Sequence, residues 1–188
     1  MLSPQLSLPG IVGTLRTLTA GARSADRSAF VGAMAATVNG VTVVTTDGAG
    51  GRHGVTVSSM TSVSADPPLL LVAINRRNPL VTAIRASGGF GVSVLGAHQA
   101  TVADSFAGRP GAVAPYDFGH GRWEQRAGGA PLLAGSAARF DCALASMTDA
   151  ASHVLVLGAV RHAARDCVPA LAYTRRGYAV TRPLSRLT

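Results

Sequence analysis

The chain has 188 residues, of which 47% are hydrophobic and 14% are charged. This composition excludes an intrinsically disordered chain, and the length suits one domain with at most a short appendage. The longest strictly apolar run, Leu69 to Ile74, is far shorter than the roughly 20 residues that a membrane-spanning helix needs. Pro4 and Pro9 interrupt the apolar N-terminal residues, and no basic cluster precedes them, so we expect no secretory signal. We therefore expect a cytoplasmic protein without a membrane partner.

All 17 basic residues are arginine, and with nine acidic residues they give a formal net charge of +8 at pH 7. A GC-rich genome explains the absence of lysine, and selection for guanidinium groups that bind phosphate is the alternative. The arginines are scattered, with Arg76–Arg77 and Arg175–Arg176 as the only doublets. Aromatic residues make up 5% of the chain, which leaves few rings for stacking bases. Nucleic-acid binding is therefore an alternative that only the charge suggests, and we expect no nucleic-acid partner.

The N-terminal part of the chain combines an irregular segment with a helix signal. Residues 1–25 carry several prolines and glycines without a hydrophobic period, so we expect a loose arm before a domain over 26–188. Asp26 is a favourable N-cap, and apolar residues follow it at helical spacing as far as Asn39–Gly40.

Strands and short helices are expected in the rest of the chain. The β-branched segments 41–46 and 54–58 flank a glycine-rich turn and predict a β-hairpin. The apolar run 69–74 predicts a central strand that is covered on both faces. Asn78 before a proline predicts the start of a short helix, and Gly88 predicts its end. A further helix at 99–106, a long loop at 108–131, and strands are expected at 90–95, 137–147, 153–160, 170–173 and 178–180.

About seven strands joined mostly by turns predict a mainly β fold, a barrel with helical plugs rather than a doubly wound sheet. Phosphate-loop, dinucleotide-binding and nucleophile-elbow motifs are missing from the sequence. Cys142 and Cys167 are too few for a disulfide framework or a four-ligand zinc site, and the five histidines lack the spacing of helical metal pairs. We therefore expect no metal site. The single glutamate, Glu124, argues against a two-carboxylate glycosidase.

Hydroxyl side chains crowd the segment from Thr56 to Ser64, at the end of an expected strand. One interpretation is a turn in which serine and threonine side chains satisfy nearby backbone groups. The other is a cradle of hydroxyls and backbone amides for an anionic ligand.

Three segments in chain order, Gly40–Thr46, His53–Ser59 and Ser62–Leu69, resemble the short-chain flavin reductases. These are the reductase components of two-component flavin-dependent monooxygenases. The resemblance spans roughly residues 26–180 and continues through 74–77, 90–95, 106–108 and 152–158. It implies an FMN-binding split β-barrel, a Greek-key antiparallel barrel that forms a homodimer. It also implies that the protein reduces FMN or FAD with NADH or NADPH and supplies the reduced flavin to a separate oxygenase.

The resemblance also implies residue roles. Fourteen residues are implied as contacts of the flavin, at its ring edge, its ribityl chain or its phosphate. They are Thr45, Thr46, Thr56, Val57, Ser58, Ser59, Ser62, Ala73, Ile74, Asn75, Arg76, Arg77, Asn78 and Phe106. The hydroxyl-rich segment would wrap the ring, and the residues after Asn75 would meet the phosphate. His153 is implied as the catalytic residue beside the nicotinamide. Tyr173 and Arg175 are implied as contacts of the pyridine nucleotide.

The sequence departs from the family pattern at three places, one of which is a shortened segment at Asn78. Ala151-Ser152-His153 stands where the family usually has Gly-Asp-His, so the carboxylate that would orient the imidazole is replaced. Asn39-Gly40 replaces the common Thr-Gly before the first strand. For His153, the alternative to a catalytic role is an ordinary strand histidine. For the whole protein, the changed motif leaves open a flavin- or heme-binding carrier or sensor on the same barrel that does not catalyse turnover.

Overall fold

The structure is a computed structural model, and it describes residues 25–109, 116–126, 129–182 and 184. The expected arm over 1–25 lies outside the described residues except for its last position. The chain divides into two compact units, Met1–Ala35 and Ala36–Thr188. Helix α2 (Arg27–Ala36) begins as predicted after Asp26, whose carboxylate accepts a hydrogen bond from the Ala29 amide at 2.9 Å. Among the described residues, no helix has both the length and the apolar content to cross a membrane.

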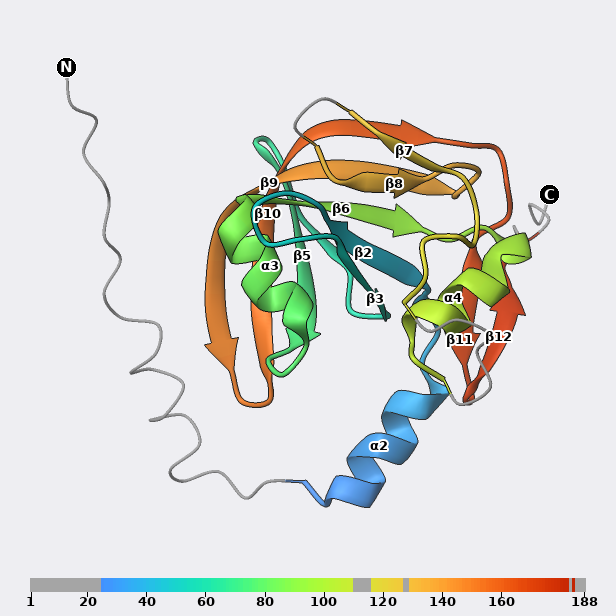
Figure 1. Cartoon of the computed structure of the whole chain (residues 1–188). Coiled ribbons are helices and arrows are strands. Elements are labelled where there is room, and N and C mark those ends of the chain that lie inside the picture. Colours follow the sequence, from blue (N-terminus) through green and yellow to red (C-terminus); the bar gives the residue numbers. More distant parts are fainter. Residues whose placement is uncertain (1–24, 110–115, 127–128, 183, 185–188) are drawn as a thin grey trace. The chain divides into compact units, whose positions relative to one another are not determined.

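The unit Ala36–Thr188 is built on antiparallel sheets (Figure 1). The largest sheet has the strand order β3-β2-β6-β9-β10-β5-β4, and every neighbouring pair in it is antiparallel. In that order the strands are β3 (His53–Val57), β2 (Thr42–Thr46), β6 (Gly89–Val94), β9 (Ala138–Ala150), β10 (His153–Arg165), β5 (Pro68–Asn75) and β4 (Thr61–Ala65). The predicted mainly β fold and the predicted hairpin, now β2 and β3, are confirmed.

The two edges of this sheet come together. Strands β3 and β4 are at opposite ends of the strand order, but only residues 58–60 connect them. Within this connection, the Ser59 hydroxyl donates to the Ala73 carbonyl at 2.8 Å and accepts from the Ala73 amide at 3.0 Å. Because Ala73 lies in β5, next to the far edge, the end of β3 is fastened to the opposite side of the sheet. The sheet therefore curls into a barrel.

Two smaller sheets adjoin the barrel. One joins β1 (Asn39–Gly40), β11 (Leu171–Thr174) and β12 (Gly177–Val180), and the other joins β7 (Trp123–Gln125) and β8 (Pro131–Leu133). The first is attached through a triangle of backbone hydrogen bonds. The Val41 amide donates to Leu171, the Leu171 amide to Leu95 and the Leu95 amide to Val41, at 2.8–3.0 Å. Strand β11 and the barrel strands β2 and β6 therefore hold one another in place.

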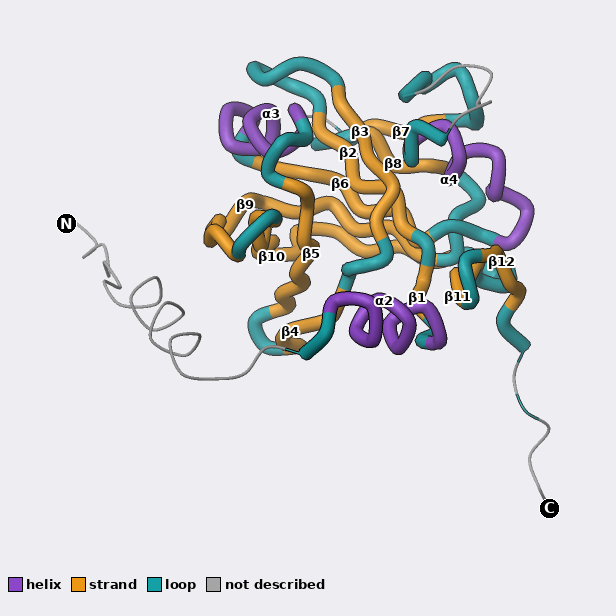
Figure 2. Tube along the Cα trace, turned by 90° about the horizontal axis from the view of Figure 1, so that it is seen from below, coloured by secondary structure: helices purple, strands orange, loops and turns teal. Residues whose placement is uncertain are grey.

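Among its described residues, this unit has the helices α3 (Pro79–Ser87) and α4 (Ala100–Phe106), and α4 follows a 3₁₀ turn at Ala97–Gln99. They lie at separate places around the strands (Figure 2). The side chain of Asn78 accepts from the Leu80 amide at 2.9 Å, and Gly88 ends α3 with φ of 70°, as the capping signals predict.

The core consists of two apolar clusters. The first joins strands of the barrel to α3 and contains Val44, Leu70, Val72, Ile74, Leu80, Val81, Ile84, Phe90, Val92, Cys142, Val154 and Val156. The second joins β2 and α4 to β8 and β11 and contains Val41, Val43, Leu95, Val102, Ala103, Phe106, Leu133 and Leu171. Helix α4 is therefore anchored by its buried face, which fixes where the residues after it emerge.

Four expectations for these elements were wrong. Strand β5 is not covered on both faces, because Leu70, Val72 and Ile74 are buried while Leu69, Leu71 and Ala73 are half-buried. A barrel strand buries its inner face completely, and its outer face needs a separate cover. Two predicted irregular regions contain strands, β4 in the hydroxyl-rich segment and β7 with the start of β8 in the expected loop. The described residues form twelve strands rather than about seven.

Candidate functional site

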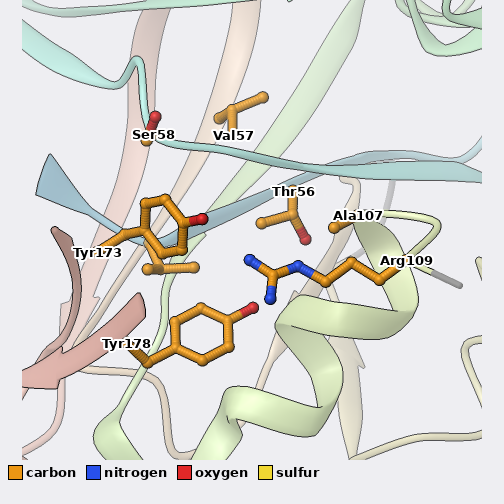
Figure 3. Close-up of a pocket in the computed structure, with 8 residues that line it drawn as sticks. Thr56, Val57, Ser58, Ala107, Arg109, Tyr173 and Tyr178 are labelled. Atoms are coloured by element: carbon orange, nitrogen blue, oxygen red, sulfur yellow. The ribbon is translucent and has the colours of Figure 1, made fainter. Parts of the chain in front are cut away.

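A pocket of about 220 Å³ opens where β3 ends and the hydroxyl-rich segment begins (Figure 3). It is lined by Val41, Thr56, Val57, Ser58, Ala107, Arg109, Tyr173 and Tyr178. Four of these eight residues, Thr56, Val57, Ser58 and Tyr173, are implied by the resemblance. The lining comes from four separate parts of the chain: Val41 between β1 and β2, the end of β3, the segment after α4, and the β11–β12 hairpin.

The hairpin supplies two tyrosine rings to the pocket. Its turn residues, Arg175 and Arg176, have φ of 48° and 64°. A two-residue turn with positive φ at both positions matches the twist of an antiparallel pair. The register then places Tyr173 directly opposite Tyr178, with ring centroids 5.7 Å apart and an interplanar angle of 67°. Arg175 is exposed at the turn and does not line the pocket.

Arg109 brings a positive charge to these rings. Its guanidinium carbon lies 5.1 Å from the ring centroid of Tyr178 and 5.6 Å from that of Tyr173. Asp104 pairs with Arg109, with Nε and Oδ1 3.3 Å apart, and accepts a hydrogen bond from the Tyr178 hydroxyl at 2.7 Å. Burial, together with this hydrogen bond, raises the pKa of Tyr178 above its ordinary value. The phenol therefore stays a protonated donor throughout the neutral range.

The hydroxyl-rich segment divides between the two interpretations of its sequence. Thr56 donates to the Ala103 carbonyl at 2.8 Å, and Ser59 bonds to the backbone of Ala73. Both hydroxyls therefore satisfy backbone groups, but these groups are distant in the sequence and not the nearby ones that the turn interpretation expects. Ser58 is exposed and lines the pocket, and no described residue hydrogen-bonds to its hydroxyl. Of the hydroxyls at 56–59, that of Ser58 is therefore placed to meet a ligand.

A second group of predicted residues meets at the end of β5. Asn75 pairs in register with His153 at the start of β10, and the Arg76 amide donates to the Ser152 carbonyl at 3.1 Å. The Ser152 hydroxyl lies 2.9 Å from Nδ1 of His153. The Arg76 guanidinium lies 4.0 Å from Asp149. The structure thus brings Asn75, Arg76 and His153 together, with a hydroxyl beside the imidazole.

A second pocket, of about 240 Å³, borders the start of β3. It is lined by Arg52, His53, Gly54, Asn78, Pro79 and Tyr116. Asn78 is the implied site residue among them, and its side-chain oxygen is used to cap α3. His53 is the first residue of β3 and Val57 is its last, so this strand runs from the second pocket to the one beside Tyr173.

The remaining implied residues line neither of these pockets. Thr45 and Thr46 are buried, and their hydroxyls donate to the backbone carbonyls of Pro131 and Gly89. Phe106 is buried and packs edge-on against Phe118 and Trp123. The other four lie on strands or just after them and are Ser62, Ala73, Ile74 and Arg77. Ile74 is buried, and the other three are exposed or half-buried. Their roles toward a ligand stay predictions.

Sequence reasoning missed Val41, Ala107, Arg109 and Tyr178. Tyr178 could have been found, because a two-residue turn at Arg175–Arg176 places it opposite Tyr173. Arg109 follows α4 and carries no periodic signal. Its position depends on how α4 packs against the barrel, which the local sequence does not encode.

The fold and the pocket define a β-barrel protein with a site suited to an aromatic ligand that carries a phosphate, because guanidinium groups pair with phosphates and aromatic rings stack with heterocycles. Residues 34–182 match the flavin reductase like domain, and the chain belongs to this family. It is 39% identical over 163 residues to "FMN reductase (NADH) RutF 1" of Methylorubrum extorquens strain PA1, covering 85% of this chain and 79% of that protein. It is 41% identical over 161 residues to "Flavin reductase (NADH)" of Kitasatospora aureofaciens, covering 82% and 81%.

A solved structure agrees with these matches. The chain resembles BorF, the flavin reductase component of a bacterial two-component tryptophan halogenase, with a TM-score of 0.74 and 36% identity. The likeness covers 85% of this chain and all of that one. The split-barrel fold implied by the sequence resemblance is confirmed.

Proposed function

We propose that the protein is an NAD(P)H:flavin oxidoreductase that reduces FMN or FAD and supplies the reduced flavin to a partner oxygenase. The observation that carries this proposal is the pocket at the end of β3. There the predicted flavin-binding residues Thr56, Val57 and Ser58 face Tyr173 and Arg109 in a member of the flavin reductase family. Relatives named as NADH-dependent flavin reductases support the same activity.

The residues present fit such a ligand by their chemistry. The guanidinium group of Arg109 matches a phosphate, and the rings of Tyr173 and Tyr178 offer apolar surface to a flat heterocycle. Ser58 can donate to or accept from the polar edge of that heterocycle. Strand β3 is at the edge of its sheet, so backbone groups on its free side are available for hydrogen bonds.

When bound, a flavin accepts a hydride from a reduced nicotinamide, so the bond-making chemistry belongs to the cofactors. The protein's task is to bind both and orient them. We assign the flavin to the end of β3 and the nicotinamide to the side of His153. Ser59 links these two places, because it bonds to Ala73, whose register partner Leu155 lies two residues from His153. Ser152, 2.9 Å from Nδ1, holds the imidazole in place of the usual carboxylate.

We also propose a homodimer. The outer face of β5 and β10 pairs Leu71 with Leu157 and Ala73 with Leu155, and these side chains are only half-buried. On the neighbouring strand β4, Val63 is 52% exposed. Apolar side chains that are left partly exposed on neighbouring strands are typical of a protein interface, and a second copy of the chain would cover them. Light scattering should give twice the mass of the chain at micromolar concentration, and a monomer mass would contradict the proposal.

The function is tested by mixing the purified protein with NADH or NADPH and with FMN or FAD. We expect nicotinamide absorbance to fall at a rate that depends on added flavin. His153→Ala should raise the KM for the nicotinamide and leave flavin affinity, measured by fluorescence quenching, near the wild-type value. Failure to oxidise either nucleotide with any of these flavins would contradict the proposal. Tight stoichiometric flavin binding without oxidation would favour a carrier or sensor instead.

A further inference from the structure

We infer that Arg109 binds a phosphate group of a nucleotide cofactor in the pocket at the end of β3, and that Asp104 is its positioning residue. This inference rests on the proposed function, and it assigns roles to two residues that the family resemblance does not point to. The phosphate belongs either to the flavin nucleotide or to the pyridine nucleotide, and the two sources can be separated by experiment.

The direction in which Arg109 points is the first support. The closest approach of Asp104 is to Nε, at 3.3 Å, on the side of the guanidinium nearest its own stem. Neither terminal amino group of Arg109 hydrogen-bonds to another described residue. Figure 3 shows this end of the side chain reaching toward the space between Tyr173 and Tyr178. Two parallel donors facing a pocket are the arrangement that binds a phosphate in a bidentate manner.

The second support is that the guanidinium is held before any ligand arrives. Asp104 is fixed by the Tyr178 hydroxyl at 2.7 Å, and it fixes Arg109 in turn. Both tyrosine rings lie within 5.6 Å of the guanidinium carbon, which adds cation–π attraction to this ion pair. A side chain that is already ordered loses less conformational entropy on binding. An arginine that served only to pair with Asp104 would not need its terminal donors in the pocket.

The test compares each nucleotide with a ligand of the same ring that lacks phosphate. Flavin binding is measured by fluorescence quenching with FMN and with riboflavin. The pyridine arm compares kcat/KM for NADH with that for reduced nicotinamide riboside, using riboflavin as the acceptor. In one of these pairs, Arg109→Met should lower the affinity or kcat/KM for the phosphate-bearing ligand by about tenfold to a hundredfold. The value for the phosphate-free ligand should stay within about twofold of the wild type. Arg109→Lys, which keeps the charge but loses the fork, should fall in between.

Asp104→Asn separates positioning from simple charge. The asparagine keeps an acceptor for Tyr178 but removes a negative charge near the expected phosphate. Electrostatics alone would therefore strengthen phosphate binding, whereas loss of the ion pair that orients Arg109 would weaken it. We expect weaker binding of the phosphate-bearing ligand, and stronger binding would overturn the positioning role of Asp104.

Arg122→Met is the matched control. Arg122 is exposed and paired with Glu124 at 2.8 Å, and it does not line the pocket, so its loss changes the net charge equally without touching the site. In Arg122→Met, the ratio of FMN to riboflavin affinity and the ratio of kcat/KM for NADH to that for reduced nicotinamide riboside should both stay at the wild-type value.

The inference is overturned if Arg109→Met changes neither ratio, lowers riboflavin affinity as much as FMN affinity, or gives the same ratios as Arg122→Met. Thermal melting of each variant identifies loss of folding. If the wild-type protein bound no flavin and oxidised no NADH, the proposed function itself would fail.

Discussion

Ser58 and Ser59 are neighbours in the chain, but their side chains have different surroundings. Ser59 satisfies both the amide and the carbonyl of Ala73, while Ser58 is exposed at the pocket. Residue type alone could not distinguish them, because both interpretations of a hydroxyl-rich segment need the same side chains. The distinction comes from the curl of the sheet, which brings Ala73 to one serine and leaves the other to a ligand.

Replacing the two serines separately should give opposite results. Ser59→Ala leaves two backbone groups without a partner and should lower the free energy of unfolding by about 1–2 kcal/mol, or roughly 2–8 °C in Tm. Ser58→Ala should leave Tm unchanged and weaken flavin binding by about threefold to tenfold, because one hydrogen bond to the ligand is lost. Calorimetry and flavin fluorescence on both variants check this. A lower Tm for Ser58→Ala with unchanged flavin affinity would reverse the assignment.

At the scale of whole elements, local signals predicted what local contacts determine. Asn78 and Gly88 cap α3 at the predicted residues, and the β2–β3 hairpin follows its β-branched segments. Strand β4 was missed because it is an edge strand whose residues are mostly exposed, so its pattern does not alternate. Only half of the residues that line the pocket were predicted, because the others are also placed by tertiary contacts. Arg109 and the hairpin that carries Tyr173 meet through tertiary packing, and no spacing in the sequence records that meeting.

The β11–β12 turn offers a test of element geometry. Arg176 has φ of 64°, a conformation that costs an L-residue with a side chain roughly 1–2 kcal/mol and costs glycine nothing. Arg176→Gly should therefore raise Tm by about 1–3 °C after the extra entropy of glycine in the unfolded chain is subtracted. Arg176→Ala removes the same charge but keeps the strain. In thermal melts it should show no such rise, and equal gains for both variants would mean that charge, not backbone conformation, is responsible.

At the scale of the molecule, the absence of lysine simplifies the response to alkaline pH. All 17 basic residues are arginine, and a guanidinium stays protonated well beyond pH 12. Cysteine and tyrosine side chains are therefore the ones that ordinarily lose protons between about pH 9 and 12. Two of them are held neutral in the folded state. Burial, helped by the Asp141 carboxylate, raises the pKa of the Cys142 thiol from 9.0 to about 12, and burial also raises that of Tyr178.

The stability of the protein should consequently fall as the pH rises above about 9. In that range the unfolded chain releases the Cys142 proton while the folded chain keeps it, so the unfolded state binds fewer protons and is favoured. The stabilisation from the neutral Cys142 thiol is fully present below about pH 9. By about pH 10.5 the free energy of unfolding is lower by about 2 kcal/mol for this reason, and Tyr178 lowers it further. Urea unfolding from about pH 8 to 10.5 measures this slope. Cys142→Ala should make it shallower, whatever that variant costs at neutral pH, while Cys167→Ala, at an exposed position, should keep the wild-type slope. Equal slopes for all three proteins would show that the buried thiol does not control alkaline stability.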